Sequence, residues 1–325
     1  VPDFDSLKHV EGAGYKGCAW GVFDRPGQKD ELGTLNLITP ALVARAAKEE
    51  IIDGDRLSLD WGLEKLQFPA FGRKLPEHKL IDLVPLLDFC GHDEQISFSP
   101  QTGSHWNTPL HVALQSWEPQ RSKQYYNGLR HDDFKARNEL NHGIRNVHKQ
   151  GGICGRGVLL DWAAWAEKHG KERDPLLRRR IPVTELEAVA KAQNVVFRAG
   201  DILCIRLGFT AWYNDASQTD RKRVAAEGTE FLGIEANEES FRWHWNNHFA
   251  AVATDSLTYE AWPPSTPNLH EYLLAMWGSM IGKLWDLEEL ANLCAKKKRW
   301  TFFLASAPLN VDSGITSPAN VLALF

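Results

Sequence analysis

The sequence has few cysteines, and no pattern pairs them. Its 325 residues include five widely spaced cysteines without a C-x-x-C pair, namely Cys18, Cys90, Cys154, Cys204 and Cys294. An odd number at such spacing argues against a disulfide framework and against a cysteine-based zinc site. Reduced thiols are therefore expected, in a cytoplasmic protein.

Long apolar runs and an excess of positive charge are also missing. No apolar stretch approaches the roughly 20 residues needed to cross a bilayer, so a membrane protein is not expected. The chain has 37 Lys and Arg against 42 Asp and Glu, a net charge of −5, which gives no electrostatic footprint for nucleic acid. No G-x-S-x-G motif indicates a serine nucleophile. With membranes and nucleic acids not expected, the expected partner is a small-molecule substrate.

Helix and strand signals mix along the whole chain. Thr39 and Pro40 precede an apolar-periodic run and predict a helix over residues 41–51 with Thr39 as its N-cap. Capping-box patterns that begin at Thr184 and Asp286 predict two more helices, to about residues 193 and 297. Apolar runs predict buried strands near residues 158–160, 202–207, 249–254 and 300–304. Since nothing marks a boundary, we predict one α/β domain over residues 1–325.

The segment 101–111, Q-T-G-S-H-W-N-T-P-L-H, carries the most chemical information. In an extended chain, alternate side chains point the same way. Gln101, His105, Asn107 and His111 would then converge on one patch with two imidazoles and two amides. Taken by itself, the pattern is equally compatible with histidines that share no role.

This segment resembles the H-x-G-T-H-x-D-x-P-x-H signature of the cyclase family, which includes bacterial kynurenine formamidases and isatin hydrolases. Four other stretches resemble family motifs in the same order, at residues 30–37, 155–161, 200–208 and 252–255. The similarity is greatest to the longer, eukaryotic-type branch. It implies a compact α/β fold with a mixed β-sheet flanked by helices, and assembly as a homodimer or homotetramer.

The resemblance also implies a site. In metal-dependent members, the first two His and the Asp of the signature bind a divalent metal, and its last His transfers protons. At these positions the present sequence has Gln101, His105, Asn107 and, for the last His, His111.

A downstream His and Glu complete the metal ligands of the family. The His corresponds to His270, whereas the Glu falls at about Lys283. A shift in register to Asp286 or Glu289 would restore one carboxylate.

The changed ligand positions favour a site without a metal. Neutral amides are poor ligands for a divalent cation, and an ammonium would repel one at close range. We therefore expect no cofactor. The alternative is a divalent metal, zinc or manganese, held by His105, Asn107 and His270.

The predicted chemistry is proton transfer on a small carbonyl-containing, aromatic metabolite, by cyclisation, isomerisation, dehydration or lactone opening. His111 is the predicted acid or base, with His105, His270 and Lys283 as further catalytic residues. Gln101 and Asn107 are predicted to bind the substrate. A metal-dependent amide or lactone hydrolase and an inactive small-molecule-binding relative remain as alternatives.

Three further residues are candidates for substrate binding. Asp255 follows an apolar strand, where polar side chains often face the site, although a loop-capping role fits as well. Trp106 and Trp262 are candidate pocket walls, because family substrates are commonly small aromatics. Core packing is the alternative for both.

Overall fold

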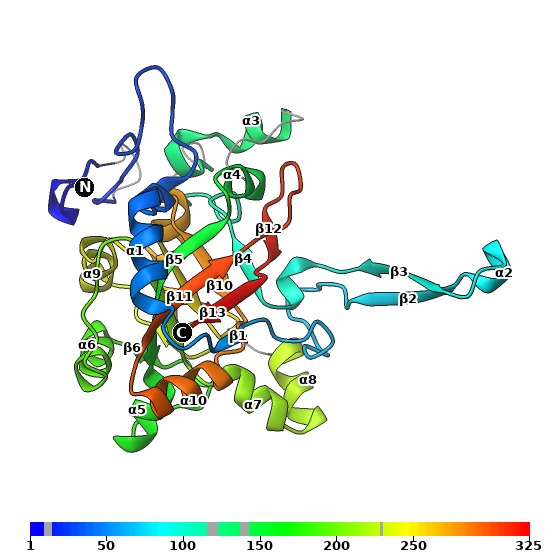
Figure 1. The fold of residues 1–325 in the computed structure, drawn as a ribbon. Helices are drawn as coiled ribbons and strands as arrows, with labels where there is room; N and C mark the ends of the chain where they lie inside the picture. The colour runs from blue at the N-terminus through cyan, green and yellow to red at the C-terminus, as the bar shows by residue number, and fades with distance from the viewer. Residues whose placement is uncertain (10–14, 116–122, 137–142, 228–229) are drawn as a thin grey trace.

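One curled, mixed β-sheet organises the part of the chain that the computed structural model describes, residues 1–9, 15–115, 123–136, 143–227 and 230–325 (Figure 1). Four neighbouring strands run parallel, and the others pair antiparallel. In spatial order the strands are β1 (Arg56–Ser58), β13 (Val321–Leu324), β11 (Thr301–Ser306), β5 (Ile153–Asp161), β7 (Ile202–Arg206), β9 (Ala251–Thr254), β10 (Met280–Lys283), β4 (His105–Asn107) and β12 (Thr316–Pro318). The predicted α/β class with a mixed sheet is confirmed.

Helices flank this sheet. α1 lies over β5 and β11, while α5, α6 and α9 lie on the other side (Figure 1). The helices are α1 (Pro40–Glu50), α2 (Val84–Leu87), α3 (His131–Ala136), α4 (Ile144–Lys149), α5 (Trp162–Lys168), α6 (Val183–Ala192), α7 (Phe209–Asp215), α8 (Gln218–Glu227), α9 (Glu238–Asn246) and α10 (Glu288–Lys297). Short 3-10 turns occur at Phe4–Ser6, Gly33–Leu37, Pro100–Thr102 and Tyr126–Gly128, and Glu271–Met276 forms a π-helical turn.

The N-cap residues of three helices can be compared with the predicted ones. Thr39 caps α1 as predicted, since its side chain accepts a hydrogen bond from the Leu42 N–H at 3.3 Å. The two helices predicted from capping boxes are present as α6 and α10, but their predicted N-caps were wrong. Thr184 already lies inside α6, whose N-cap is Pro182, and α10 starts after Leu287, one residue beyond Asp286. The N-cap lies two residues before the predicted position in α6 and one residue after it in α10.

Two of the family motifs meet in a buried ion pair that holds the sheet. Arg156 on β5 donates to Asp201, just before β7, at 2.8 Å and to Glu50 at 3.0 Å. All three side chains are largely buried. Burial raises the pKa of Asp201 to about 6, against the opposing effect of Arg156. These motif residues therefore stabilise strand packing.

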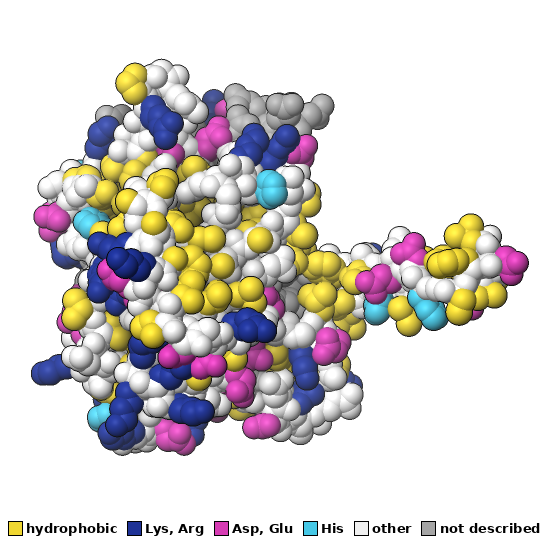
Figure 2. All heavy atoms as spheres, in the orientation of Figure 1, with side chains coloured by type: hydrophobic (Ala, Val, Ile, Leu, Met, Phe, Trp, Pro, Cys, Tyr) yellow, Lys and Arg dark blue, Asp and Glu magenta, His cyan; other side chains and the backbone are white. Residues whose placement is uncertain are grey.

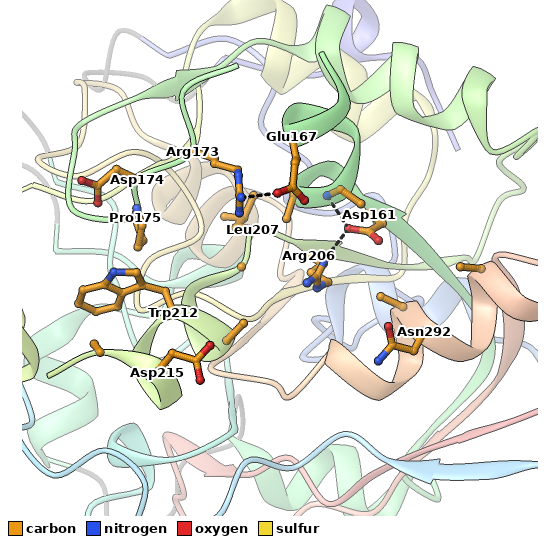
Figure 3. Close-up of a pocket in the computed structure, with 17 residues that line it drawn as sticks. Asp161, Glu167, Arg173, Asp174, Pro175, Arg206, Leu207, Trp212, Asp215 and Asn292 are labelled. Carbon is orange, nitrogen blue, oxygen red and sulfur yellow. Dashed lines mark hydrogen bonds and ion pairs between the residues drawn. The ribbon is translucent and has the colours of Figure 1, made fainter. Parts of the chain in front are cut away.

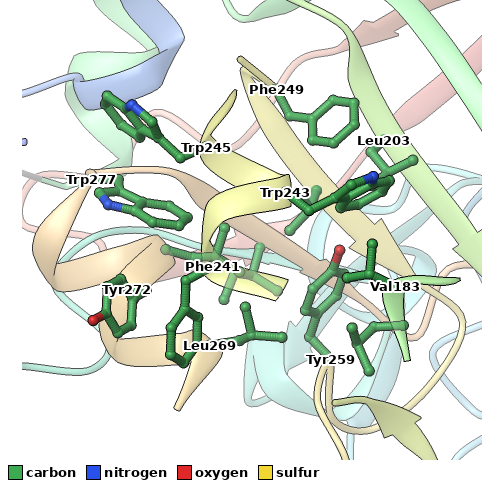
Figure 4. Packing of buried hydrophobic residues seen from close by; sticks show 14 of the residues in the cluster. Val183, Leu203, Phe241, Trp243, Trp245, Phe249, Tyr259, Leu269, Tyr272 and Trp277 are labelled. Carbon is green, nitrogen blue, oxygen red and sulfur yellow. The ribbon is translucent and has the colours of Figure 1, made fainter. Parts of the chain in front are cut away.

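The largest group of buried side chains lies on the face of the sheet that α5, α6 and α9 cover. Phe241 stacks on Tyr272 at a ring-centroid distance of 3.9 Å, and Tyr259 and Leu269 are fully buried in the same group (Figure 4). Because Tyr259 and Leu269 precede Glu260 and His270 in sequence, the packing fixes the backbone from which these two polar side chains extend.

A two-stranded arm projects from this body (Figures 1 and 2). It consists of β2 (Glu77–Asp82) and β3 (His92–Ser97), which pair antiparallel, with α2 at its tip. The 3-10 turn Pro100–Thr102 follows directly after the arm and leads into β4.

Candidate functional site

The alternation of side chains along β4 builds one wall of the site. His105 and Asn107 point to the same face, and the Asn107 Nδ2 lies 3.4 Å from the His105 Nε2. The His105 Nδ1 lies 2.7 Å from the Gly103 carbonyl oxygen, so Nδ1 donates to it and Nε2 points toward the amide. Both side chains are buried.

The neighbouring strand brings a cation to this wall. Lys283 ends β10 and pairs directly with His105 across the antiparallel ladder, and it is only 5% exposed. Lys283, and not Asp286 or Glu289, is thus the residue that lies beside His105. Asp286 accepts a hydrogen bond from the Glu288 N–H at the start of α10, and Glu289 is exposed on that helix.

A carboxylate, an imidazole and an amine lie in series beside this wall. The Glu260 carboxylate and the His270 Nδ1 are 2.6 Å apart, and the His270 Nε2 is 3.5 Å from the Lys283 Nζ. Burial raises the pKa of Glu260, but the charge and hydrogen bond of His270 outweigh it, so the pKa is lowered overall. Glu260 thus orients the imidazole so that Nε2 faces the cluster.

The two amides complete the group. Gln101 donates from Nε2 to the Asn107 Oδ1 at 2.5 Å, and the same Nε2 lies 3.5 Å from the His111 Nδ1. The ring centroids of His111 and His270 are 6.4 Å apart. The predicted extended stretch is only three residues long, since Gln101 lies in the 3-10 turn, yet these side chains still converge.

The electrostatic environment keeps two of the imidazoles neutral. Burial, followed by the charge of Lys283, holds the pKa of His105 well below its ordinary value and lowers that of His111 to about 2. Burial and then the Arg73 guanidinium lower the pKa of Lys283 to about 7, although Glu260 acts in the opposite direction. Near neutral pH the Lys283 amine is therefore divided between its charged and neutral forms.

Trp262 packs against the segment that precedes the arm, and no contact of its ring with the described residues of the cluster is seen. Its ring contacts Phe71 edge-on at 5.9 Å, and the Arg73 guanidinium lies 5.0 Å from the Phe71 ring. Arg73 also acts electrostatically on His105, His111 and Lys283. The segment just before the arm thus reaches the cluster.

Two predicted binding residues lie elsewhere. Trp106 points to the opposite face of β4, where it is fully buried against Trp285 and donates from Nε1 to Ser306. Asp255 is fully buried, and its carboxylate accepts hydrogen bonds from the Leu207 N–H at 2.7 Å and the Gly208 N–H at 2.6 Å. Both placements correspond to the packing and capping alternatives, because strand alternation and a tight turn direct these side chains away from the cluster.

Sequence reasoning did not find Glu260 or Arg73. Glu260 lies ten residues before His270 and has no motif of its own. The one available signal was general, since a functional histidine often has a carboxylate as its hydrogen-bond partner. Arg73 lies about 30 residues before the signature, and only the tertiary fold brings it close.

A separate hollow of about 830 Å³ lies at the carboxyl ends of β5 and β7 (Figure 3). Two ion pairs lie in it: Arg206 contacts Asp161 at 2.8 Å, and Arg173 contacts Glu167 at 2.6 Å. Trp212 forms part of its wall. Its lining among the described residues contains no histidine, cysteine or lysine, so it lacks the acid–base groups of the histidine cluster.

Similarity to known proteins gives further evidence on this site. A family model described as "Putative cyclase" matches residues 57–261, which include the cluster residues on β4 and Glu260. The chain belongs to the cyclase family. The comparison with curated proteins gave no match.

Solved structures agree with this membership. A crystal structure of a novel cyclase superimposes with a TM-score of 0.81 at 28% identity, covering 95% of this chain and 99% of that one. Isatin hydrolase A from Ralstonia solanacearum has a TM-score of 0.57 at 16% identity, covering 88% and 96%. Isatin hydrolase A from Labrenzia aggregata, bound to benzyl benzoate, has a TM-score of 0.58 at 17% identity, covering 89% and 98%. The last two share the fold with this cyclase-family chain.

Family membership supports an enzyme of the hydrolase or cyclase class that acts on small molecules. Within the described ranges, the structure has no helix long and apolar enough to cross a membrane.

Proposed function

We propose that this cyclase-family protein transfers protons on a small, carbonyl-bearing aromatic metabolite by general acid–base catalysis without a metal. The reaction would be a cyclisation, isomerisation, dehydration or lactone opening. The arrangement of Glu260, His270 and Lys283 carries the proposal. A buried carboxylate fixes the imidazole, which presents a basic nitrogen 3.5 Å from an amine.

In the proposed reaction, His270 Nε2 takes a proton from the atom next to the substrate carbonyl. Lys283, in its charged form, donates a hydrogen bond to the oxygen on which negative charge develops. The imidazolium formed is stabilised by Glu260, and it returns the proton to a different atom of the substrate. His111 has a pKa too low to carry a proton at neutral pH, so we assign it hydrogen bonding to the substrate in place of acid–base transfer.

One buried hydrogen-bond acceptor suggests that the substrate carries a hydrogen-bond donor. The Gln101 Oε1 is buried and has no hydrogen-bond partner among the described residues. Leaving such an atom unpaired costs about 1–3 kcal/mol, so a ligand that donates to it gains affinity. We therefore propose a substrate with an N–H or O–H group near its carbonyl, which reaches the cluster past the partly exposed His111 and His270.

The side chains present do not fit a divalent cation. Gln101 and Asn107 provide only amide groups, already hydrogen-bonded to each other. The Lys283 amine lies 3.5 Å from the His270 nitrogen that would bind the metal, where its charge would repel the ion. Within the described residues, no three His, Cys, Asp or Glu side chains form a group that could hold a metal.

One observation favours the alternative, a zinc- or manganese-dependent hydrolase of amides or lactones. His105 and His270 each have Nδ1 bonded to an acceptor and Nε2 directed inward, as metal-bound imidazoles do. With Asn107 they would be the ligands. The third possibility, an inactive relative that binds a small molecule, would keep affinity for the ligand without turnover.

Metal content and turnover together test the proposal. The protein would be purified without chelator or affinity-tag nickel, analysed for metals, and screened against aromatic lactones, amides and keto compounds with and without a chelator. Turnover that survives the chelator, in protein without stoichiometric metal, is expected. Turnover that requires one equivalent of zinc or manganese would establish the hydrolase alternative, and ligand binding that never leads to turnover would favour the inactive relative.

A further inference from the structure

Arg73 is a half-buried cation without a carboxylate partner. Among the described residues its guanidinium forms no ion pair, and it lies 5.0 Å from the centre of the Phe71 ring. Burial lowers its pKa, and no nearby acid opposes this effect. A guanidinium that is partly removed from water without a counter-charge is unfavourable, because it loses hydration and gains no attraction in return. An anion that reached this group would therefore be attracted to it.

A second cation faces Arg73 from the cluster. Arg73 affects the pKa of Lys283 more than the Glu260 carboxylate does, and it lowers the pKa of two cluster histidines as well. Glu260 compensates little of this charge, since its carboxylate is 2.6 Å from the His270 Nδ1 and pairs with that ring. Positive charge thus exceeds negative charge around the cluster, and an anion beside Arg73 would relieve the repulsion.

The turn before Arg73 has an unusual backbone. Phe71 has a φ of +63° and Gly72 a φ of +65°. A bulky aromatic residue seldom adopts this left-handed conformation, and strain of this kind is found mostly where a side chain must be held in place. The Phe71 ring packs edge-on against Trp262 at 5.9 Å and lies beneath the guanidinium. The backbone and the ring contacts together fix the position of Arg73.

Arg73 also lines a hollow of about 660 Å³ at the base of the arm, beside α8 (Figure 1). Two exposed cations, Lys74 and Lys222, belong to the same lining, which has Glu77 as its one acidic residue among the described ones. The apolar walls come from Phe68, Pro69 and Leu75. Apolar walls with a few convergent charges, in a hollow of this size, suit a small aromatic anion.

We propose that Arg73 binds a carboxylate of the substrate, so that the substrate is an aromatic carboxylic acid whose acid group is separate from the reacting carbonyl. The planar guanidinium can donate two parallel hydrogen bonds to the two oxygens of a carboxylate. Lys283 remains free to face the carbonyl. The inference rests on the proposed function only in taking the cluster as the place where the substrate binds.

Equilibrium binding to the wild-type protein is the first test, and it needs no turnover. Titration calorimetry would compare benzoate with benzamide, which has a similar shape without the charge, and with phenyl phosphate. Benzoate is expected to bind at least about tenfold more tightly than either. The proposal is overturned if benzamide binds as tightly as benzoate, if benzoate shows no saturable binding, or if phenyl phosphate binds more tightly.

Substitution of Arg73 tests the contact itself. Arg73→Gln should weaken benzoate binding by about 10–100-fold and change benzamide binding by less than about twofold. Arg73→Lys should lie between the wild type and Arg73→Gln, because it keeps the charge but loses the planar pair of donors. Arg45→Gln, at an exposed position on α1, is the matched control and should bind benzoate as the wild type does. Equal benzoate affinity in Arg73→Gln and the control would contradict the proposal.

The exposed lysines of the hollow separate direct contact from general attraction. Lys74→Gln with Lys222→Gln should weaken benzoate binding less than Arg73→Gln does, and the effect should disappear at about 0.5 M salt, since exposed charges are screened. The loss in Arg73→Gln should persist at that salt concentration. The opposite ranking would make the lysines the binding residues and reject Arg73.

Thermal unfolding without ligand distinguishes a binding role from a structural one. Arg73→Gln should leave Tm unchanged or raise it, because it removes an unpaired, partly buried charge. A lower Tm together with equal losses of benzoate and benzamide binding would show a structural role and overturn the proposal. A requirement for metal in turnover would reject the metal-free reaction, whereas benzoate binding through Arg73 would still support the carboxylate site.

Discussion

Lys283 lies directly opposite His105 across the β10–β4 ladder, and its amine is 3.5 Å from the His270 imidazole. The strand pairing thus places a cation where the resemblance to metal-dependent relatives implied a carboxylate. One substitution changes the sign of the charge at the centre of the site.

Lys283→Met is expected to stabilise the fold at neutral pH. The folded-state pKa of about 7 lies below the ordinary 10.5, so the unfolded chain binds the proton more tightly between these values. Wild-type stability should therefore rise between pH 7 and about 9.5, by roughly 3 kcal/mol on this account. The stability of the variant should not rise with pH in this range.

Urea unfolding at several pH values would measure the slope of the free energy of unfolding against pH. Lys48→Met, at an exposed position on α1, should keep the wild-type slope. Equal slopes in the Lys283 variant and the wild type would show that the amine is not held neutral by the fold.

His270→Ala is expected to lower kcat by about 10²–10⁴-fold, because it removes the proposed base. Glu260→Gln should lower kcat less and shift the pH–rate profile, since Glu260 positions the imidazole and stabilises its charged form. His148→Ala, at an exposed position, is the control. Steady-state kinetics on a substrate from the screen would check these effects, and a Glu260→Gln profile identical to wild type would remove Glu260 from the proposed mechanism.

Restoring the signature should restore metal affinity. A variant with Gln101→His, Asn107→Asp and Lys283→Glu replaces two amides and an amine with ligands that suit a divalent ion. Titration calorimetry with zinc should show one site in this variant and none of comparable affinity in the wild type. Tight stoichiometric binding by the wild type would instead support the metal-dependent hydrolase.

Asp255→Ala is expected to destabilise the fold by about 2–4 kcal/mol, because two buried backbone N–H groups lose their acceptor. Chemical denaturation would measure the loss, with exposed Asp215→Ala as the control. If the variant were as stable as wild type but bound ligand more weakly, Asp255 would belong to the site after all.

Much of the fold could be predicted from local patterns. Buried strands produce apolar runs, so the predicted strands fall within or overlap β5, β7, β9 and β11. The helix after Thr39 was equally clear. Capping boxes were less reliable, because Thr184 and Asp286 lie close to helix ends without being the N-caps. The arm gave no distinct signal, since its alternating apolar and charged residues are not buried against the body.

Residue type and local spacing were enough to predict the α/β class, the family resemblance and the neutral amides and histidines of the signature. The folded chain was needed to show that Lys283 lies opposite His105 and that Glu260 orients His270. It also showed that Trp106 and Asp255 lie away from the cluster. Those relationships depend on strand register and on which face of a strand a side chain occupies. A shift of one residue in register would turn the side chains of β4 and β10 to the opposite face, and long-range packing sets that register.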